Sequence, residues 1–483
     1  MATVRSEISL AAASGGFTVR LALALSGIVF LLMVSFGVIM RAAQAGWLPV
    51  EPELFYRLMT AHGIGMVGTA GLTGAMIMWL FASRHLRLTP WVPAVFLALF
   101  LVGVTFILEA ILISGFAGAW TFLHPLPTVS GGVWQPTAAV VYLLGLLLVG
   151  VGFLLLHLEI GRGAIAAYGN LGRALALPLL WRGEQDRPPP PAVVAATAAT
   201  VFNILGIVVG AAVVLAMLVN ALLPSFAVDP LAAKNMIYFF GHVFINASIY
   251  MAVIAVYEVV PEYTGRPWKT TRVFAAAWAA IIILVLAVYP HHLLQDTVMP
   301  AWALVLGQIL SYASGLPLLV VTVLSLLAYL YRAAVRWDLA LALLVTGVGS
   351  WAVGVVPAII DGMIGINRIL HNTLWVPGHF HTYLLLGEMA MALGVMAWLV
   401  RRPDERLDGL PAAAFWTYLG AGSVFVLAFL LGGWASVPRR WAVHAAEWMW
   451  LGRLATVAAL FVLLAAVVMV GRFLVRTALN SGR

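Results

Sequence analysis

The chain has 483 residues, of which 63% are hydrophobic and only 9% are charged. Soluble globular proteins carry roughly 25% charged residues, so this composition excludes a water-soluble protein. The 26 Lys and Arg residues outnumber the 18 Asp and Glu residues, and we attribute the net charge of +8 to membrane topology and not to nucleic-acid binding.

Twelve apolar segments are long enough to cross a bilayer, because a membrane-spanning helix needs about 20 residues. The sequence therefore predicts an all-α fold, a polytopic membrane bundle of about 12 transmembrane helices in a single domain over residues 1–483. A proline-rich stretch at 187–191 is expected to form the loop between spans four and five. In chain order, the expected spans cover residues 20–43, 55–82, 91–117, 133–157, 193–223, 231–260, 272–294, 300–330, 338–362, 371–400, 411–435 and 449–475.

Basic residues indicate how the chain is oriented, since Lys and Arg collect in cytoplasmic loops. With alternating spans, the two termini and the loops after even-numbered spans contain 19 of the 26 basic residues. We therefore expect both termini on the cytoplasmic side of a bacterial or archaeal inner membrane. The outer side contains the other seven basic residues, which are Arg41, Arg57, Lys234, Arg368, Arg439, Arg440 and Arg453.

Six of the eleven histidines fall at one depth, in the outer third of the membrane. Ionisable side chains at this depth are costly and usually face a cofactor, a cavity or a partner. A hydrogen bond to a neighbouring helix explains one such histidine, but six on four helices indicate a metal or haem centre. The chain has no cysteine, so any metal must be held by imidazole or oxygen ligands. The six are His62 in span two, His242 in span six, His291 and His292 at the end of span seven, and His379 and His381 in span ten.

The spacing of these histidines separates them into groups. His379 and His381 lie two positions apart, about 200° around a helix, so they point to opposite sides and serve different centres. His62 and His381 offer two axial imidazoles for a low-spin haem. His379 would bind a high-spin haem whose other face stays open for a small gas molecule. The remaining three imidazoles suit copper or another transition ion opposite that face.

The same residues stand in motifs that resemble subunit I of the haem-copper oxidoreductase superfamily over nearly the whole chain. HNTLWVPGHFH at 371–381 is similar to the span-ten signature of the B-type branch, and the adjacent histidines of span seven resemble its copper pair. The resemblance implies the ligand roles just given, with copper as the ion called CuB. It also implies that Arg439 and Arg440, in VPRR, bind haem propionates through their guanidinium forks.

The sequence departs from the family pattern four residues after His242. Oxygen reductases of the A and B branches carry a tyrosine there, covalently joined to the histidine, which supplies an electron and a proton when the O–O bond breaks. This chain has Asn246, and an i+4 spacing places it on the same helix face. Because an amide cannot be oxidised, we favour a nitric oxide reductase that converts two NO to N2O and water.

Two alternatives stay open. A terminal oxygen reductase, a cytochrome c or quinol oxidase subunit I that reduces O2 to water, would need a relocated phenol such as Tyr289 or Tyr250. A non-catalytic membrane cytochrome or transporter would use the histidines for haem or metal binding alone. Familiar nitric oxide reductases carry at the i+4 position a glutamate that ligates iron, so three imidazoles without a carboxylate favour copper over iron.

Reduction consumes protons and electrons, and the sequence suggests a route for the protons only. Tyr257 lies four turns below His242 on the same line of span six, where B-type oxidases also carry a channel tyrosine, and Glu258 adjoins it. Electrons must come from a second subunit with a dicopper centre or a c-type haem, or from quinol. Hydroxyls that could continue the proton path, or serve helix packing equally well, are Ser311, Ser314 and Thr322 on span eight.

Other ionisable residues receive no role from the sequence. Glu109 and Glu388 are further carboxylates within spans. The remaining histidines of loops or span ends are expected to be solvated, namely His85, His124, His157 and His444.

Overall fold

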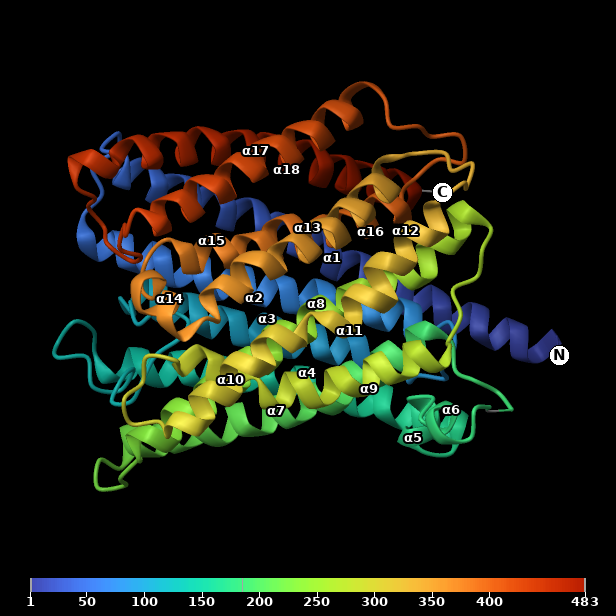
Figure 1. The fold of residues 1–483 in the computed structure, drawn as a ribbon, viewed down its shortest axis with the longest axis horizontal. Helices are drawn as coiled ribbons and strands as arrows, with labels where there is room; N and C mark the ends of the chain where they lie inside the picture. Colours follow the sequence, from blue (N-terminus) through green and yellow to red (C-terminus); the bar gives the residue numbers. More distant parts are fainter. Residues whose placement is uncertain (1, 185, 482–483) are drawn as a thin grey trace. The chain divides into compact units, whose positions relative to one another are not determined.

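The computed structural model describes residues 2–184 and 186–481, and these ranges contain no β-strand. The helices of the first half are α1 (Ala2–Gln44), α2 (Pro52–Ala82), α3 (Val92–Leu108), η1 (Glu109–Ile113), α4 (Pro136–Tyr168), α5 (Leu171–Ala174), α6 (Pro178–Trp181), α7 (Pro191–Leu222) and α8 (Pro230–Thr264) (Figure 1).

The second half continues in the same way. Its helices are α9 (Arg272–Ala287), η2 (Tyr289–Leu293), α10 (Ala301–Ser314), α11 (Leu316–Leu318), η3 (Leu319–Leu324), α12 (Ser325–Leu330), α13 (Leu339–Asp361), α14 (Ile364–Leu370), α15 (Trp375–His381), η4 (Thr382–Met389), α16 (Ala390–Leu399), α17 (Gly409–Trp434), η5 (Ala446–Trp448) and α18 (Met449–Ser481).

Twelve helical segments among the described residues are long and apolar enough to cross a membrane. Their number and order confirm the predicted all-α bundle of about 12 transmembrane helices. They cover Gly16–Gln44, Pro52–Ala82, Val92–Ile113, Pro136–Tyr168, Pro191–Leu222, Pro230–Thr264, Arg272–Leu293, Ala301–Leu330, Leu339–Asp361, Trp375–Leu399, Gly409–Trp434 and Ala446–Leu479.

The chain divides into two compact units. Unit 1 comprises Met1–Leu23, Gly71–Ile254 and Lys269–Leu286, and unit 2 comprises Ala24–Ala70, Ala255–Trp268 and Ala287–Arg483. Within unit 1, α4 packs against α3 and α7; within unit 2, α17 packs against α18 and α15, and α13 packs against α16 (Figure 1).

Small residues let the helices of unit 1 approach closely. A side chain on Gly103 of α3 would place its Cβ 2.6 Å from the carbonyl oxygen of Gly145 on α4. Glycine pairs of this kind are typical of helix contacts in membranes, where close van der Waals packing replaces the hydrophobic effect between helices.

Three expected spans are interrupted where functional candidates lie. Pro290 has no N–H for an α-helical hydrogen bond, and the segment that carries His291 and His292 is the 3-10 helix η2. The span-ten helix changes to a π-helix directly after His381, and span eight changes to a π-helix at Leu319. Short π-helical segments often occur at functional sites.

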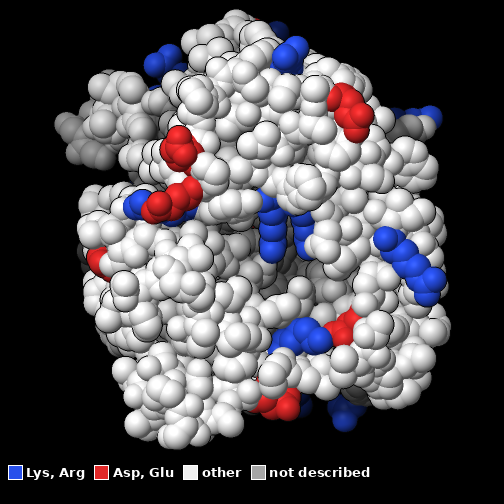
Figure 2. All heavy atoms as spheres, turned by 90° about the vertical axis from the view of Figure 1, so that its left-hand side faces the viewer, with Lys and Arg blue, Asp and Glu red and all other residues white. Residues whose placement is uncertain are grey.

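Charged side chains are sparse on one end of the molecule. Figure 2 views the end that lies at the left of Figure 1, and most of its atoms belong to residues without formal charge, with Lys, Arg, Asp and Glu scattered among them. The turn between α17 and α18, which contains the predicted propionate-binding arginines, lies at this end in Figure 1.

Candidate metal and cofactor centre

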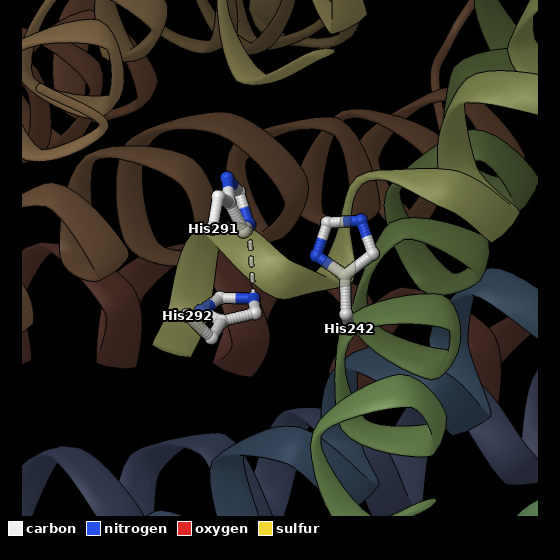
Figure 3. Close-up of side chains that lie close together, drawn as sticks. All are labelled: His242, His291 and His292. Atoms are coloured by element: carbon white, nitrogen blue, oxygen red, sulfur yellow. Dashed lines mark hydrogen bonds between the residues drawn. The ribbon is translucent and has the colours of Figure 1, made fainter. Parts of the chain in front are cut away.

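Three histidines form a group that fits a metal ion. His242 lies on α8, and His291 and His292 lie on η2. One ring nitrogen from each falls within 4.8 Å of the others, and the rings turn toward one another (Figure 3). Nitrogens that share one ion at about 2.0 Å lie about 3 to 4 Å apart, so small side-chain movements suffice to place an ion among them.

The pair on η2 is held by a hydroxyl of the next membrane helix. His291 Nδ1 lies 3.0 Å from Ser311 Oγ on α10, and His291 Nε2 lies 3.1 Å from His292 Nε2. A metal-binding imidazole usually bonds a second group through its other nitrogen, which fixes the ring orientation. Ser311 was predicted as part of a proton path, and the sequence alone did not indicate this contact with His291.

Gly307 allows α10 to pack against η2. A Cβ at this position would lie 2.9 Å from the backbone nitrogen of His291 and 3.0 Å from the backbone carbon of Pro290. Backbone atoms cannot move aside as the end of a flexible side chain can. Glycine at position 307 therefore allows α10 to pack this closely against the segment that carries His291 and His292.

We expect Gly307→Ala to weaken copper binding by about 10-fold, a loss typical of changes behind metal ligands. Copper and haem iron in the purified protein are quantified by elemental analysis. Gly349→Ala on α13 is the matched control, because no atom lies within 4 Å of a Cβ placed there. A full copper content in Gly307→Ala would contradict this expectation.

A second histidine pair fits the two axial ligands of a haem. The ring centroids of His62 and His381 are 6.2 Å apart, and the ring planes differ by 24°. Each ring bonds a backbone carbonyl through Nδ1: His62 bonds Met33 O at 2.7 Å and His381 bonds Pro377 O at 2.6 Å. These bonds leave Nε2 of both rings for an iron. Two metal–nitrogen bonds of about 2.0 Å plus the two ring radii match the observed separation.

Aromatic rings, a glycine and the Arg41 guanidinium, which lies 4.6 Å from the centroid of the Phe429 ring, surround this pair. The rings of Phe425 and Phe429 on α17 each lie 5.2 Å from the ring of His381. A Cβ on Gly37 of α1 would lie 3.2 Å from His62 Cε1. The glycine therefore leaves room for the His62 ring, and the two aromatic rings pack against the ring of His381.

His379 has different neighbours from His381, although both lie on α15. Its ring meets Tyr383 edge to face, with centroids 4.8 Å apart. Because the two histidines contact different side chains, they suit separate centres, as their spacing predicts.

The arginine pair lies beside the beginning of span ten. Arg439 donates from Nη2 to Asn372 Oδ1 at 2.8 Å, and its backbone N–H donates to Asn372 O at 2.8 Å. Thr373 and Pro438 form an isolated antiparallel bridge. Arg440 follows in a left-handed backbone conformation with φ of 67°. The VPRR segment is therefore fixed to the HNT segment six residues before His379. Propionate binding by the two arginines stays a prediction.

Two of the residues predicted to form a proton path are in contact, and the path itself stays a prediction. Tyr257 Oη on α8 lies 2.6 Å from Thr322 Oγ1 on η3, and both side chains are buried. Ser314 donates to the backbone carbonyl of Ser311, whose own hydroxyl contacts His291. Glu258 is partly exposed. The other candidate tyrosine of span six, Tyr250, packs between Phe202 and Trp278, with centroids 5.8 Å from each.

Two histidines expected to be solvated are buried, so that expectation was wrong. His157 on α4 has no exposed surface and bonds two residues of α7, with Thr200 Oγ1 3.2 Å from Nδ1 and Asn203 Nδ2 2.7 Å from Nε2. The sequence placed it at a span end, but α4 continues to Tyr168 and carries it inside the membrane segment. His444, in the turn after α17, is only 3% exposed.

The burial of His444 predicts a pH-dependent stability. Burial, together with nearby Arg41, lowers the pKa of His444 to about 4. Unfolding restores an ordinary pKa of about 6.5, so the unfolded state binds the extra proton and stability falls as pH drops from about 6.5 toward 4. We expect His444→Gln to reduce the loss of Tm between pH 7 and pH 5, with exposed His85→Gln as the control. Equal losses of Tm in wild type and His444→Gln would refute it.

Comparison with known proteins identifies the family of this chain. The family model described as "Cytochrome C and Quinol oxidase polypeptide I" matches residues 18–471. The chain is 25% identical over 434 residues to cytochrome c oxidase polypeptide 1 of Halobacterium salinarum, which covers 86% of this chain and 69% of that one. It is 24% identical over 457 residues to cytochrome c oxidase subunit 1 of Synechocystis, which covers 90% and 78%.

A solved structure shares the fold. A heme-copper terminal oxidase, described as a dimer studied by cryo-EM, matches with a TM-score of 0.79 and 18% identity, over 97% of this chain and 84% of that chain. The match confirms the architecture expected from the resemblance. Because the family model covers almost the whole chain, the protein belongs to the cytochrome c and quinol oxidase polypeptide I family and is a haem-copper oxidoreductase.

Proposed function

We propose that this protein is the catalytic subunit of a membrane nitric oxide reductase. The observation that carries the proposal is the residue one helical turn after the metal ligand His242. Asn246 occupies that position, and its Nδ2 lies 3.2 Å from His242 Nε2. An amide therefore lies within hydrogen-bond distance of the outer nitrogen of the ligand.

The number of electrons that each reaction needs connects the amide of Asn246 to the identity of the substrate. Reduction of O2 to two waters takes four electrons, and oxidases of the resembling branches draw one from a tyrosine at this position. The conversion 2 NO + 2 H⁺ + 2 e⁻ → N2O + H2O takes two electrons and needs no oxidisable side chain. Asn246 accepts or donates hydrogen bonds but gives up no electron. NO reduction is therefore compatible with an amide at this position.

Four groups of residues would hold the cofactors. The pair His62 and His381 would bind a low-spin haem, His379 a high-spin haem, and the three-histidine group a copper ion, with iron less favoured by three imidazoles. Arg439 and Arg440 would pair with propionates. When bound, these groups supply electron transfer and a binding place for the gas.

The chain's own side chains would move the protons. Glu258 lies near the cytoplasmic end of α8, and the buried contact between Tyr257 and Thr322 joins α8 to η3. Ser311, which lies on the same span as Thr322, contacts His291. Internal water that bridges buried polar groups would link these hydroxyls. In this proposal, Tyr257 and Glu258 take up the protons that reduction consumes.

Electrons would arrive from outside the chain. No cysteine is present to ligate a dicopper centre or to attach a c-type haem. We therefore propose a second subunit with such a centre, or quinol, as the donor to the low-spin haem. The membrane would be the cytoplasmic membrane of a bacterium or archaeon, crossed many times with both termini inside.

Terminal oxygen reduction is the second candidate, and the names of the relatives favour it. The similar proteins named above are oxidases, and a ubiquinol oxidase subunit 1 of Acetobacter aceti is also similar, at 24% identity over 209 residues. At these identities a change of substrate within one family is compatible with a shared fold. We place NO reduction first because residue 246 is an asparagine, whereas the resembling oxidases carry a tyrosine at this position.

One experiment separates the candidates. The purified protein is supplied with a chemical reductant, and N2O formation under anaerobic NO and O2 consumption in air are both measured. We expect one N2O per two NO and slow O2 consumption. Rapid O2 consumption without N2O would reject the first candidate in favour of the second. A protein with intact haems that consumes neither gas would support the non-catalytic cytochrome. The His242→Ala variant defines the background rate.

A further inference from the structure

Asn246 contacts the metal ligand His242 at two points. Its Nδ2 donates to the backbone carbonyl of His242 at 2.9 Å and lies 3.2 Å from Nε2 of the same residue. Figure 3 shows the orientation of the His242 ring: Nδ1, next to the carbon that carries the side-chain stem, faces His291 and His292, whereas Nε2 points away. The amide therefore lies behind the ligand and not between the ligands.

These contacts restrict the rotation of the imidazole. A ring turned by 180° about χ2 would exchange Nδ1 and Cδ2, and the nitrogen that meets the other two histidines would be lost. The amide can bond only a nitrogen at the outer position, since a ring carbon is no acceptor. A hydrogen bond at Nε2 therefore selects the ring orientation in which Nδ1 faces the metal position.

The position of the proton on the His242 ring determines which atom of the amide can bond Nε2. A neutral imidazole that binds a metal through Nδ1 carries its proton on Nε2, and that N–H needs an acceptor. With Nδ2 facing it, Nε2 would accept and Nδ1 would carry the proton, as in a ring without a bound ion. Rotating the amide by about 180° presents Oδ1 to Nε2–H and serves the metal-bound ring. This rotation exchanges the bond to the His242 carbonyl for a charge-assisted one.

We propose that Asn246 is a positioning residue for the metal ligand His242, with a side-chain amide that holds Nε2 and turns from donor to acceptor when an ion binds at Nδ1. This reversible bond takes the structural role for which the resembling oxidases use a covalent link, and it leaves no phenol at the site. The inference rests on the metal-binding part of the proposed function and does not depend on which gas is reduced.

Copper binding tests the proposal without turnover. Apparent copper affinity of the purified, haem-loaded protein is measured by competition with a chelator, and the remote ring nitrogen of each copper-bound histidine is examined by pulsed EPR. We expect Asn246→Leu, which has a similar shape and no polar group, to weaken copper binding by about 10- to 100-fold. Its remote-nitrogen signal should also become heterogeneous as the ring loses its fixed orientation.

The Asn246→Asp variant tests whether the side chain at this position must accept a hydrogen bond from His242 or donate one to it. Asn246→Asp keeps the shape and accepts from Nε2–H at either oxygen, so we expect it to hold copper as tightly as wild type or more tightly. It should also lower the copper reduction potential, because a carboxylate increases the negative charge on the ring. A 10-fold loss of affinity in Asn246→Asp would overturn the acceptor role.

A matched asparagine on the same helix controls for packing. Asn235 Nδ2 donates to the carbonyl of Leu231, four residues earlier, at 2.9 Å, which is the same backbone contact that Asn246 makes. Asn235→Leu should leave copper affinity and the pulsed EPR spectrum unchanged. If Asn246→Leu binds copper as wild type does, or if Asn235→Leu weakens binding equally, the proposal is rejected. If Asn246→Leu fails to reach the membrane, the Asn246→Asp result decides.

Discussion

His242→Ala is expected to lower gas turnover by more than about 100-fold. Changing a residue that only supports a metal ligand costs up to about 100-fold, and His242 is itself a proposed ligand. The variant removes one of three ligands whose nitrogens lie within 4.8 Å, and two imidazoles hold copper weakly. The low-spin haem spectrum should stay intact, because His62 and His381 lie on α2 and α15 and keep their bonds to Met33 and Pro377. Optical spectra, copper content and turnover are measured together.

Two outcomes would contradict this expectation. Turnover within about 3-fold of wild type would show that His242 holds no essential ion. Loss of the low-spin spectrum would show that His242 serves the haem or that the fold has failed. His85→Ala, at an exposed loop position, should match wild type in all three measurements.

His381→Leu is expected to abolish the low-spin haem signal and, with it, electron delivery to the gas-binding centre. Removing one of two axial imidazoles leaves five-coordinate or absent iron, and the visible spectrum changes accordingly. Turnover should fall by more than about 100-fold, because the proposed electron route to the gas-binding centre passes through this haem. Absorbance spectra of the reduced protein and haem content per protein provide the measurements.

His62→Leu supplies the matched comparison for this prediction. If both imidazoles serve one iron, the two variants must lose the same spectral feature and no other. Variants that lose different haems would reject the shared centre. A normal low-spin signal in either variant would remove that histidine from the ligand set.

The sequence was sufficient for the features that depend on local chemistry. Twelve apolar segments, each longer than the hydrocarbon core, determine the number of spans because every backbone polar group must be paired inside a membrane. The i+4 spacing determines that Asn246 shares a helix face with His242. The two-residue spacing determines that His379 and His381 point to different sides.

The tertiary structure decided what depends on packing between distant segments. Only the packed helices place His62 6.2 Å from His381, 319 positions later in the chain, and bring Ser311 to His291. The same packing buries His157 against α7, where the sequence predicted a solvated span end. Apolar periodicity reports which face of a helix avoids water, but in a bilayer lipid and protein are equally apolar. The sequence alone therefore predicts the candidate ligands and their depth, whereas helix packing determines which group each ring nitrogen contacts.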